Sequence, residues 1–232
     1  MKIYSFTFAR SGSKGLKDKN LSKFNKKPLL YWAINDAKKS KYINKVFVST
    51  DSAKLASISR SAGAEIPFIR PKRFATDKSP EYLAWQHALN FLKKQNDLPD
   101  IFVSVPCTSP LRTYQDLDNM ISMFIKKKPN FLVGMCESNR NPYFNIVKKM
   151  KGSQIKIFSS KKKFFRRQDA PETFDLTTFA FIAKPNYILK FKNYYHSKAM
   201  GFKIDKKRSV DVDNLDDLEY AEFIRKKYDI KK

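Results

Sequence analysis

The sequence has few cysteines and glycines and no long apolar run. Its 232 residues include six glycines and two cysteines, Cys107 and Cys136, which have no CxxC spacing. Isolated cysteines of this kind predict buried free thiols in a reducing compartment. No run of 18 apolar residues predicts a transmembrane helix, and no signal-peptide pattern precedes the first apolar stretch. These absences predict a soluble cytoplasmic protein that does not bind membranes.

Acidic residues are also scarce relative to basic ones. The chain carries 47 Lys and Arg against 22 Asp and Glu, a formal charge of +25 at pH 7. Such a charge is compatible with a polyanionic partner such as nucleic acid, with an acidic small molecule, or with a lysine-rich solvated surface. The basic clusters are scattered and form neither one stripe nor an aromatic-basic RNA-binding motif. A lysine-rich surface is therefore favoured over nucleic-acid binding.

The order of apolar segments predicts an α/β domain. Short β-branched or aromatic runs alternate with amphipathic stretches. We expect strands at 3–9, 45–49, 101–105, 130–136 and 177–183, extended pieces at 65–69, 201–204 and 208–212, and helices at 27–37, 53–62, 81–94, 114–127, 184–189 and 215–228. Strands that alternate with helices favour three α/β/α layers around a mainly parallel sheet. The pattern changes at 137–172, which predicts an antiparallel excursion from that sheet.

The first predicted strand is followed by a basic, glycine-containing loop. The sequence from Ala9 to Asn20 is ARSGSKGLKDKN, with two glycines, one arginine and three lysines. Glycines let the backbone approach a ligand closely, and Arg and Lys supply charge, so the loop is suited to binding phosphates. It is neither a Walker A loop nor a GxGxxG fingerprint. A solvated basic turn is the alternative.

A second signal lies near the end of the sequence, in SVDVDN, residues 209–214. In a strand, residues two apart face the same side, so Asp211 and Asp213 are expected to point together. Two carboxylates at the end of a strand are suited to Mg²⁺, which often takes one or two carboxylates together with waters and phosphates. The alternative is a cap for the last helix, formed by Asp213 or Asn214.

Two further loops follow predicted strands and are candidates for substrate contacts. In PCTSPLR, residues 106–112, Thr108 and Ser109 offer hydroxyls, and Arg112 either binds an anion or anchors the loop. In RPKRFATD, residues 70–77, Arg70 is a candidate for binding a base or a phosphate, and the alternative is a salt bridge within the loop from Arg70 or Arg73 to Asp77. Ligands of α/β sheets bind outside the carboxyl ends of the strands, where these loops are expected to lie.

Taken in order, these motifs resemble the CMP-sialic acid synthetases (acylneuraminate cytidylyltransferases). The resemblance covers about residues 3–222 and rests on ARSGSKGLKDKN, NKKPLLYWAI, KVFVSTDSAKLA, AGAEIPFIRPKRFATD, TSPLRTYQDL and SVDVDNLDDLEYAE. RNPYFN at 140–145 and RRQ at 166–168 resemble the branch that activates bacterial nonulosonic acids such as legionaminic acid. The resemblance implies a Rossmann-like nucleotidyltransferase sheet, and it implies CTP, Mg²⁺ and an acidic 2-keto sugar as reactants. It also implies a homodimer built through an inserted arm at about 137–175.

The resemblance assigns roles to individual residues. For the nucleotide it implies a site made of Ala9, Arg10, Ser13, Lys14, Asn20 and Arg70, with Lys19 near the reacting phosphates. For the sugar acid it implies Thr108, Ser109, Arg167 and Gln168. For the metal it implies Asp211 and Asp213. Arg10, Lys19 and Asp211 would then be the catalytic residues.

The sequence departs from the family pattern at three places, and two rival interpretations remain. Pro106-Cys107 stands where Gln-Pro is usual, Thr177 where Asn is common, and Glu81 where a small polar residue or Asp is frequent. No proton acceptor is evident, because His87 and His196 lie outside the motif loops. The first rival is a CMP-KDO synthetase-type cytidylyltransferase. The second is a non-enzymatic binder of polyanions on the same fold.

Overall fold

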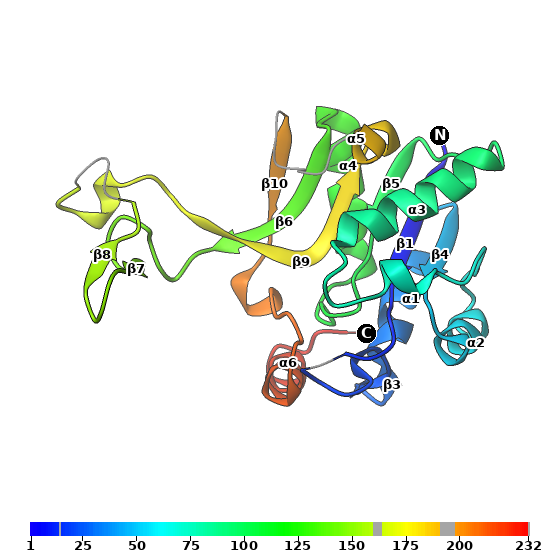
Figure 1. The fold of residues 1–232 in the computed structure, drawn as a ribbon, viewed down its shortest axis with the longest axis horizontal. Helices are drawn as coiled ribbons and strands as arrows, with labels where there is room; N and C mark the ends of the chain where they lie inside the picture. The colour runs from blue at the N-terminus through cyan, green and yellow to red at the C-terminus, as the bar shows by residue number, and fades with distance from the viewer. Residues whose placement is uncertain (14, 160–163, 191–197, 232) are drawn as a thin grey trace.

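A six-stranded sheet forms the centre of the protein (Figure 1). The computed structural model describes residues 1–13, 15–159, 164–190 and 198–231, with only the backbone of Arg167. The strand order is β10-β6-β9-β5-β1-β4. The bounds are β1 Ile3–Phe8, β4 Lys45–Ser49, β5 Ile101–Ser104, β6 Phe131–Glu137, β9 Phe174–Ala183 and β10 Ala199–Lys203. The predicted three-layer, mainly parallel fold is confirmed: β1 pairs in parallel with β4 and β5, β6 pairs in parallel with β10, and only β9 is antiparallel to its neighbours.

Both faces of the sheet are covered by helices, which explains the apolar runs of the central strands. One core cluster joins the sheet to α1 (Leu29–Lys39), α2 (Ala53–Ser61), α4 (Tyr114–Lys127) and α6 (Leu215–Lys227). The opposite cluster joins it to α3 (Glu81–Lys94) and α5 (Pro185–Lys190). The sheet is therefore buried on both sides, and only its ends remain for ligands.

The helices start and stop where local chemistry dictates. Ser52 accepts a hydrogen bond from the backbone N–H of Leu55 at 3.3 Å and caps α2, and Gly63 follows that helix with a φ of +88°. Asn214 and Asp217 form a capping box at the start of α6. The capping alternative for Asn214 is thus confirmed, whereas Asp213 is left free to face the loops described below.

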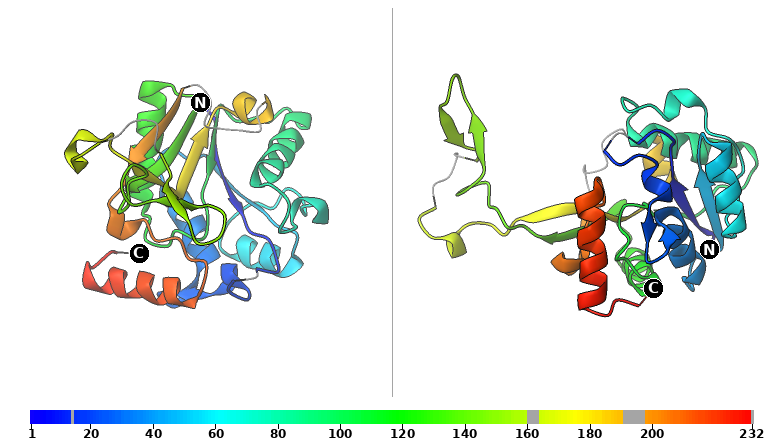
Figure 2. Two further views of the ribbon diagram at one scale, coloured as in Figure 1. Left: turned by 60° about the vertical axis from the view of Figure 1, so that its left-hand side comes forward. Right: turned by 90° about the horizontal axis from the view of Figure 1, so that it is seen from below.

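A narrow arm leaves the body where β6 and β9 run on together beyond the sheet (Figures 1 and 2). It carries a small hairpin of β7 (Val147–Lys149) and β8 (Ile155–Ile157), then a 3₁₀ turn at Arg167–Asp169. Large apolar side chains on the arm are exposed: Ile155 is 67% exposed, Phe158 61% and Phe165 94%. The arm falls at the segment for which an inserted subdomain was predicted.

One local prediction was wrong. The 208–212 segment is no strand; a 3₁₀ turn at Lys206–Arg208 is followed by irregular backbone. The 65–69 segment, predicted as an extended piece, forms two isolated parallel bridges, Glu65 with Phe47 of β4 and Ile69 with Thr50. A short antiparallel pair, β2 (Lys23–Phe24) with β3 (Lys27–Pro28), and two 3₁₀ turns, at Lys19–Leu21 and Lys72–Phe74, complete the fold. None of the helices in the described part of the chain has the length and apolarity that crossing a bilayer requires.

Candidate active site

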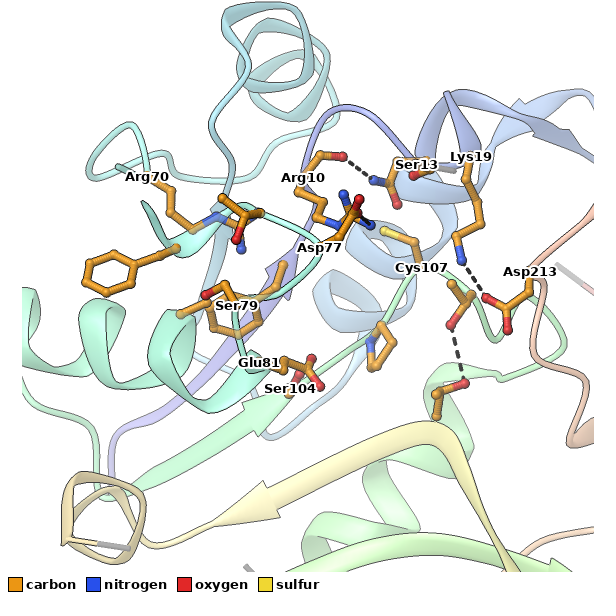
Figure 3. Close-up of a pocket in the computed structure, with 18 of the residues that line it drawn as sticks. Arg10, Ser13, Lys19, Arg70, Asp77, Ser79, Glu81, Ser104, Cys107 and Asp213 are labelled. Atoms are coloured by element: carbon orange, nitrogen blue, oxygen red, sulfur yellow. Dashed lines mark hydrogen bonds and ion pairs between the residues drawn. The ribbon is translucent and has the colours of Figure 1, made fainter. Parts of the chain in front are cut away.

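A cavity of about 580 Å³ opens at the carboxyl ends of β1 and β5 (Figure 3). Phe8 and Ser104, the last residues of those strands, form part of its wall. Most of the rest of the wall comes from three loops, the 9–20 loop, the 70–81 segment and the 106–108 turn; Ala84 of α3, Thr178 and Phe181 of β9, and Asp213 complete it. The cavity thus gathers motifs that are up to 200 residues apart in sequence.

The 9–20 loop is held in place by its own backbone and by neighbouring side chains. Ala9 is fully buried, and its N–H donates to the carbonyl of Ser49 at 3.1 Å. The Asn20 amide donates to the carbonyl of Arg10 at 3.0 Å, which closes the loop. Ser11 donates both its N–H and its hydroxyl to Asp51. Burial alone would raise the pKa of Asp51, but the hydrogen bonds from Ser11 lower it below its usual range.

The first predicted phosphate-binding cation, Arg10, is already paired with a carboxylate. Its Nη2 lies 2.6 Å from Asp77 Oδ1, and both side chains are about one-third exposed. Its Nη1 also donates to the carbonyl of Gly12 at 3.1 Å. Because Asp77 belongs to the 71–80 loop, this ion pair joins two walls of the cavity. An incoming phosphate would have to replace the Asp77 carboxylate.

The second cation, Lys19, is paired across the cavity as well. Its Nζ lies 2.7 Å from Asp213 Oδ1, and Lys19 is only 17% exposed while Asp213 is 70% exposed. The backbones meet at the same place, because a Cβ added to Gly15 would lie 2.5 Å from the carbonyl oxygen of Asp213. A side chain at position 15 would therefore push the first loop and the SVDVDN segment apart.

Arg70 supplies unpartnered donors to the cavity wall. The residue is 4% exposed, and neither its Nε nor its Nη2 has a hydrogen-bond partner among the described residues. Burial lowers the pKa of this guanidinium, whereas the charge of Asp51 raises it. A buried cation with open donors is costly unless a ligand meets it. Arg70 therefore marks a place for hydrogen-bond acceptors of a ligand.

The 106–112 turn combines a polar rim with a structural arginine. Thr108 Oγ1 donates to Thr178 Oγ1 at 3.3 Å, and the hydroxyls of Ser109 and Thr178 are 3.1 Å apart. Thr108 and Thr178 line the cavity, whereas Ser109 is buried behind it. Arg112 is 1% exposed and donates to the carbonyls of Pro106 and Phe179. Of the two roles considered for Arg112, anchoring the loop is the one that the structure supports.

Cys107 of the same turn is a buried thiol at the cavity wall. The thiol lines the cavity, yet the residue is only 4% exposed, and burial raises its pKa to about 12. At neutral pH it is a protonated, weakly polar wall group and no nucleophile.

Asp211 lies beside the cavity, held by a backbone link to the 106–112 turn. The N–H of Val212 donates to the carbonyl of Thr108 at 2.8 Å. The Oδ1 of Asp211 is buried and has no hydrogen-bond partner among the described residues. An acceptor oxygen left open in this way fits a bound cation. The described residues hold no cluster of three or more metal-ligating side chains, but Mg²⁺ often needs only one or two carboxylates from the protein.

Not every predicted site residue lies at this cavity. Arg10, Ser13, Lys19, Asn20, Arg70, Thr108 and Asp213 line it. Gln168 instead lines a separate hollow of about 530 Å³ on the arm, together with Arg140 and Glu172. Lys14 and the side chain of Arg167 lie outside the described residues. A single chain therefore does not bring Gln168 to the cavity.

Sequence reasoning missed several cavity residues, among them Asp77 and Thr178, and gave Glu81 no role. Asp77 was considered only as a partner for Arg70 or Arg73, but it pairs with Arg10. Thr178 has no motif around it, and only the turn of β9 toward Thr108 makes it part of the wall. Glu81 was noted as a departure from the family pattern, and it lines the cavity. The position of Glu81 directly after the 70–80 loop was the one sequence feature that could have indicated a place at the cavity.

His87, which lies outside the motif loops, has a packing role. Its ring packs against Phe68 and Phe74, with ring centroids 4.6 and 5.2 Å away, and burial lowers its pKa. It is not among the residues that line the cavity.

A three-layer α/β sheet with basic loops and a cavity at the carboxyl ends of its strands has the architecture of a nucleotidyltransferase. The structure is similar, at a TM-score of 0.72 and 13% identity, to a CMP:2-keto-3-deoxy-manno-octonic acid synthetase complexed with CTP, over 98% of this chain and 100% of that one. This likeness supports the fold.

Comparison of sequences identifies the family, which the structural likeness alone does not. A family model described as Cytidylyltransferase matches residues 7–230, so the chain belongs to the cytidylyltransferase family and is a nucleotidyltransferase enzyme. It is 30% identical over 219 residues to the CMP-N,N'-diacetyllegionaminic acid synthase of Campylobacter jejuni, covering 93% of this chain and 92% of the relative. It is 29% identical over 222 residues to the post-translational flagellin modification protein B of Campylobacter coli, covering 94% and 92%.

Proposed function

We propose that the enzyme transfers CMP from CTP to the anomeric hydroxyl of a nine-carbon 2-keto sugar acid of the sialic or legionaminic type. The hydroxyl oxygen forms a bond to the α-phosphorus, the bond between that phosphorus and the oxygen that bridges to the β-phosphorus breaks, and pyrophosphate leaves with that bridging oxygen. The proton of the hydroxyl passes to solvent water. Support for the acceptor comes from the relative named for CMP-legionaminic acid synthesis and from the RNPYFN and RRQ stretches.

The observation that carries the proposal is the pairing of two loop cations with exchangeable carboxylates inside one cavity. Arg10 and Lys19 are held at 2.6 and 2.7 Å by Asp77 and Asp213, so both are already aimed into the cavity. Triphosphate oxygens are strong acceptors for such donors. With phosphates bound, Arg10 and Lys19 would neutralise charge that develops on the α-phosphate and on pyrophosphate.

The open donors of Arg70 suit the cytosine base. Cytosine presents two adjacent acceptors, O2 and N3, whereas uracil carries a hydrogen at N3. The unpartnered Nε–H and Nη2–H of Arg70 offer two adjacent donors. Selection of CTP over UTP follows from this match, because uracil would leave one buried donor unpaired.

Asp211 and Asp213 are the residues that would hold Mg²⁺. The open Oδ1 of Asp211 and the exposed carboxylate of Asp213 are the hard oxygen ligands that this ion prefers. When bound, the ion would supply charge neutralisation on phosphate oxygens. The protein's part is to keep Asp213 next to the 9–20 loop through the close approach of Gly15.

The arm is proposed to complete the site in a homodimer. Ile155, Phe158 and Phe165 expose large apolar side chains that a second copy would cover. Gln168 lies on the same arm, away from its own chain's cavity. Arg167 and Gln168 of one copy would then face the sugar acid bound to the other.

The experiment is a pyrophosphate-release assay with purified protein, CTP, Mg²⁺ and a panel of acids. Legionaminic and sialic acids should be turned over faster than the eight-carbon acid KDO. Lys19→Ala should lower kcat by about 10²–10³-fold, the usual cost of one lost transition-state donor. Lys23→Ala, a change of an exposed lysine outside the cavity, is the matched control and should leave kcat unchanged. Faster turnover of KDO than of the nine-carbon acids would contradict the proposed acceptor and favour KDO. Absence of pyrophosphate release with every acid would refute the proposed reaction.

A further inference from the structure

The carboxyl end of β4 holds two walls of the cavity. The carbonyl of Ser49, its last residue, accepts the N–H of Ala9 at 3.1 Å, and the carbonyl of Thr50 accepts the N–H of Arg70 at 2.8 Å. The proposed phosphate-binding loop and the proposed base-binding segment are thus attached to adjacent residues. The structure at this strand end therefore sets the distance between them.

The next residue, Asp51, holds the 9–20 loop a second time. Its Oδ1 accepts the N–H of Ser11 at 2.8 Å, and its Oδ2 accepts the hydroxyl of Ser11 at 2.5 Å. Two charge-assisted hydrogen bonds from one carboxylate to one residue fix both the position and the orientation of that residue. Ser11 itself is exposed, so packing contributes little to holding it.

Ser11 lies directly beside Arg10, the first cation proposed for the phosphates. The guanidinium of Arg10 donates to the carbonyl of Gly12 at 3.1 Å, so its position depends on the backbone on both sides of Ser11. Gly12 has a φ of +70°, a conformation that glycine adopts and leaves easily. Ordering such a loop costs conformational entropy, and a loop that is ordered before the ligand arrives spares the ligand that cost.

Two other roles for Asp51 are less well supported. Helix α2 does not need it as a cap, because the hydroxyl of Ser52 accepts the N–H of Leu55 at 3.3 Å. Direct contact with phosphates is disfavoured, because Asp51 is not among the described residues that line the cavity and its charge would repel them. The contacts of the carboxylate therefore point to Ser11 as the residue through which it acts.

We propose that Asp51 is a positioning residue of the nucleotide site, which through Ser11 fixes the 9–20 loop so that Arg10 meets the phosphates. The inference rests on the proposed function, since it assumes that CTP occupies the cavity with its phosphates at this loop. Because Asp51 acts on the phosphate end, its effect should be absent for cytidine and largest for CTP. A role in the general stability of the site would affect both ligands alike.

The test measures dissociation constants of cytidine, CMP, CDP and CTP for the wild type, Asp51→Ala, Ser11→Ala and the double variant. Calorimetry serves for the nucleotides, and an NMR titration serves for weakly bound cytidine. Asp51→Ala should weaken CTP binding by about 10- to 100-fold, and Ser11→Ala, which keeps the bond to the N–H, by about 3- to 10-fold. Cytidine affinity should change by less than about twofold in either variant.

The double variant tests whether Asp51 acts through Ser11. Both changes break the same link, so the double variant should bind CTP as Asp51→Ala does, within about twofold. Ser11→Ala removes only an exposed hydroxyl and leaves the charge of Asp51 in place, so it isolates the link and keeps the test valid if Asp51→Ala fails to fold. Thermal unfolding checks the fold of each variant.

Asp118→Ala is the matched control, because Asp118 accepts the hydroxyl of Ser40 at 2.5 Å and is not among the described residues that line the cavity. It should leave all four dissociation constants unchanged. A loss for cytidine as large as that for CTP overturns the inference, as do single losses that multiply in the double variant. Tighter CTP binding by Asp51→Ala also overturns it, since the charge of Asp51 would then matter more than its bonds. These results leave the proposed function intact, which fails separately if the wild type binds CTP but releases no pyrophosphate with any sugar acid.

Discussion

The ion pair between Arg10 and Asp77 predicts that removing Asp77 strengthens CTP binding. In the free protein the Asp77 carboxylate occupies the guanidinium of Arg10 at 2.6 Å. Both side chains are about one-third exposed, at 34% and 32%, so solvent screens the pair and its worth is at the upper end of the surface range, about 1 kcal/mol. A phosphate that displaces Asp77 must overcome this amount. Asp77→Asn should therefore bind CTP about fivefold more tightly, since 1.4 kcal/mol corresponds to a factor of ten.

Calorimetric titration with CTP, in the absence of a sugar acid, measures this effect directly. The gain should shrink as salt rises toward about 1 M, where the screening length falls to about 3 Å. Glu137→Gln is the control, because Glu137 pairs with Lys203 at the same 2.6 Å distance but lies outside the cavity. Weaker CTP binding by Asp77→Asn would refute the reasoning, since it would mean that Asp77 holds the loops in their binding arrangement instead of competing with the phosphates.

Three further outcomes follow from other contacts. Gly15→Ala should weaken CTP binding by about tenfold or more in a titration, since the added Cβ would lie 2.5 Å from the carbonyl oxygen of Asp213. Gly12→Ala is the comparison: there is open space for its Cβ, but φ is +70°, so the variant should lose about 1–2 kcal/mol of stability and should weaken CTP binding less than Gly15→Ala does. Cys107, with a pKa of about 12, should react with iodoacetamide at pH 8 about 10³-fold more slowly than an ordinary thiol, and unfolding in guanidinium should restore the rate. Arg112→Met should lower the free energy of unfolding in urea by about 3–5 kcal/mol, because it leaves Asp36, 3.7 Å away and buried, without its cation; an unchanged midpoint would contradict the anchoring role.

The sequence predicted most of the fold because the signals for strands and helices are local. The run from Ile3 to Phe8 is mostly apolar and forms β1, which is buried on both faces, as expected of a strand covered by helices on two sides. Helix α3 begins and ends where its periodicity predicted, at Glu81 and Lys94. The 208–212 segment was wrongly predicted as a strand because alternation of Val and Asp imitates a strand. There the N–H of Val212 donates to the carbonyl of Thr108 and the side chain of Arg208 donates to the carbonyl of Leu111, but no ladder of strand hydrogen bonds forms.

The candidate site was predictable only in part. The 9–20 loop and the SVDVDN segment each suggested a ligand by composition, but their contact depends on the path of the whole chain. No pattern in the sequence shows that Lys19 meets Asp213 or that Arg10 meets Asp77, because ion pairs between loops depend on how the loops fold over each other. Gln168 is the opposite case: the motif was clear, but the residue lies on an arm that one chain alone keeps away from the cavity.

The charge excess of +25 does not accumulate at the cavity. Among the described residues that line it, three cations face three carboxylates: Arg10, Lys19 and Arg70 against Asp77, Glu81 and Asp213. When CTP binds, its phosphates would take the place of carboxylates that already pair with these cations, so the net change in charge pairing is small. The affinity for CTP should therefore fall by less than about tenfold between 50 and 200 mM salt. A polyanion that contacts 6–10 lysines or arginines on the outer surface would lose about 10³–10⁵ over the same range. Titration of CTP in the presence of duplex DNA at about 150 mM salt distinguishes the two, because competition between them would mean that the excess charge acts at the cavity after all.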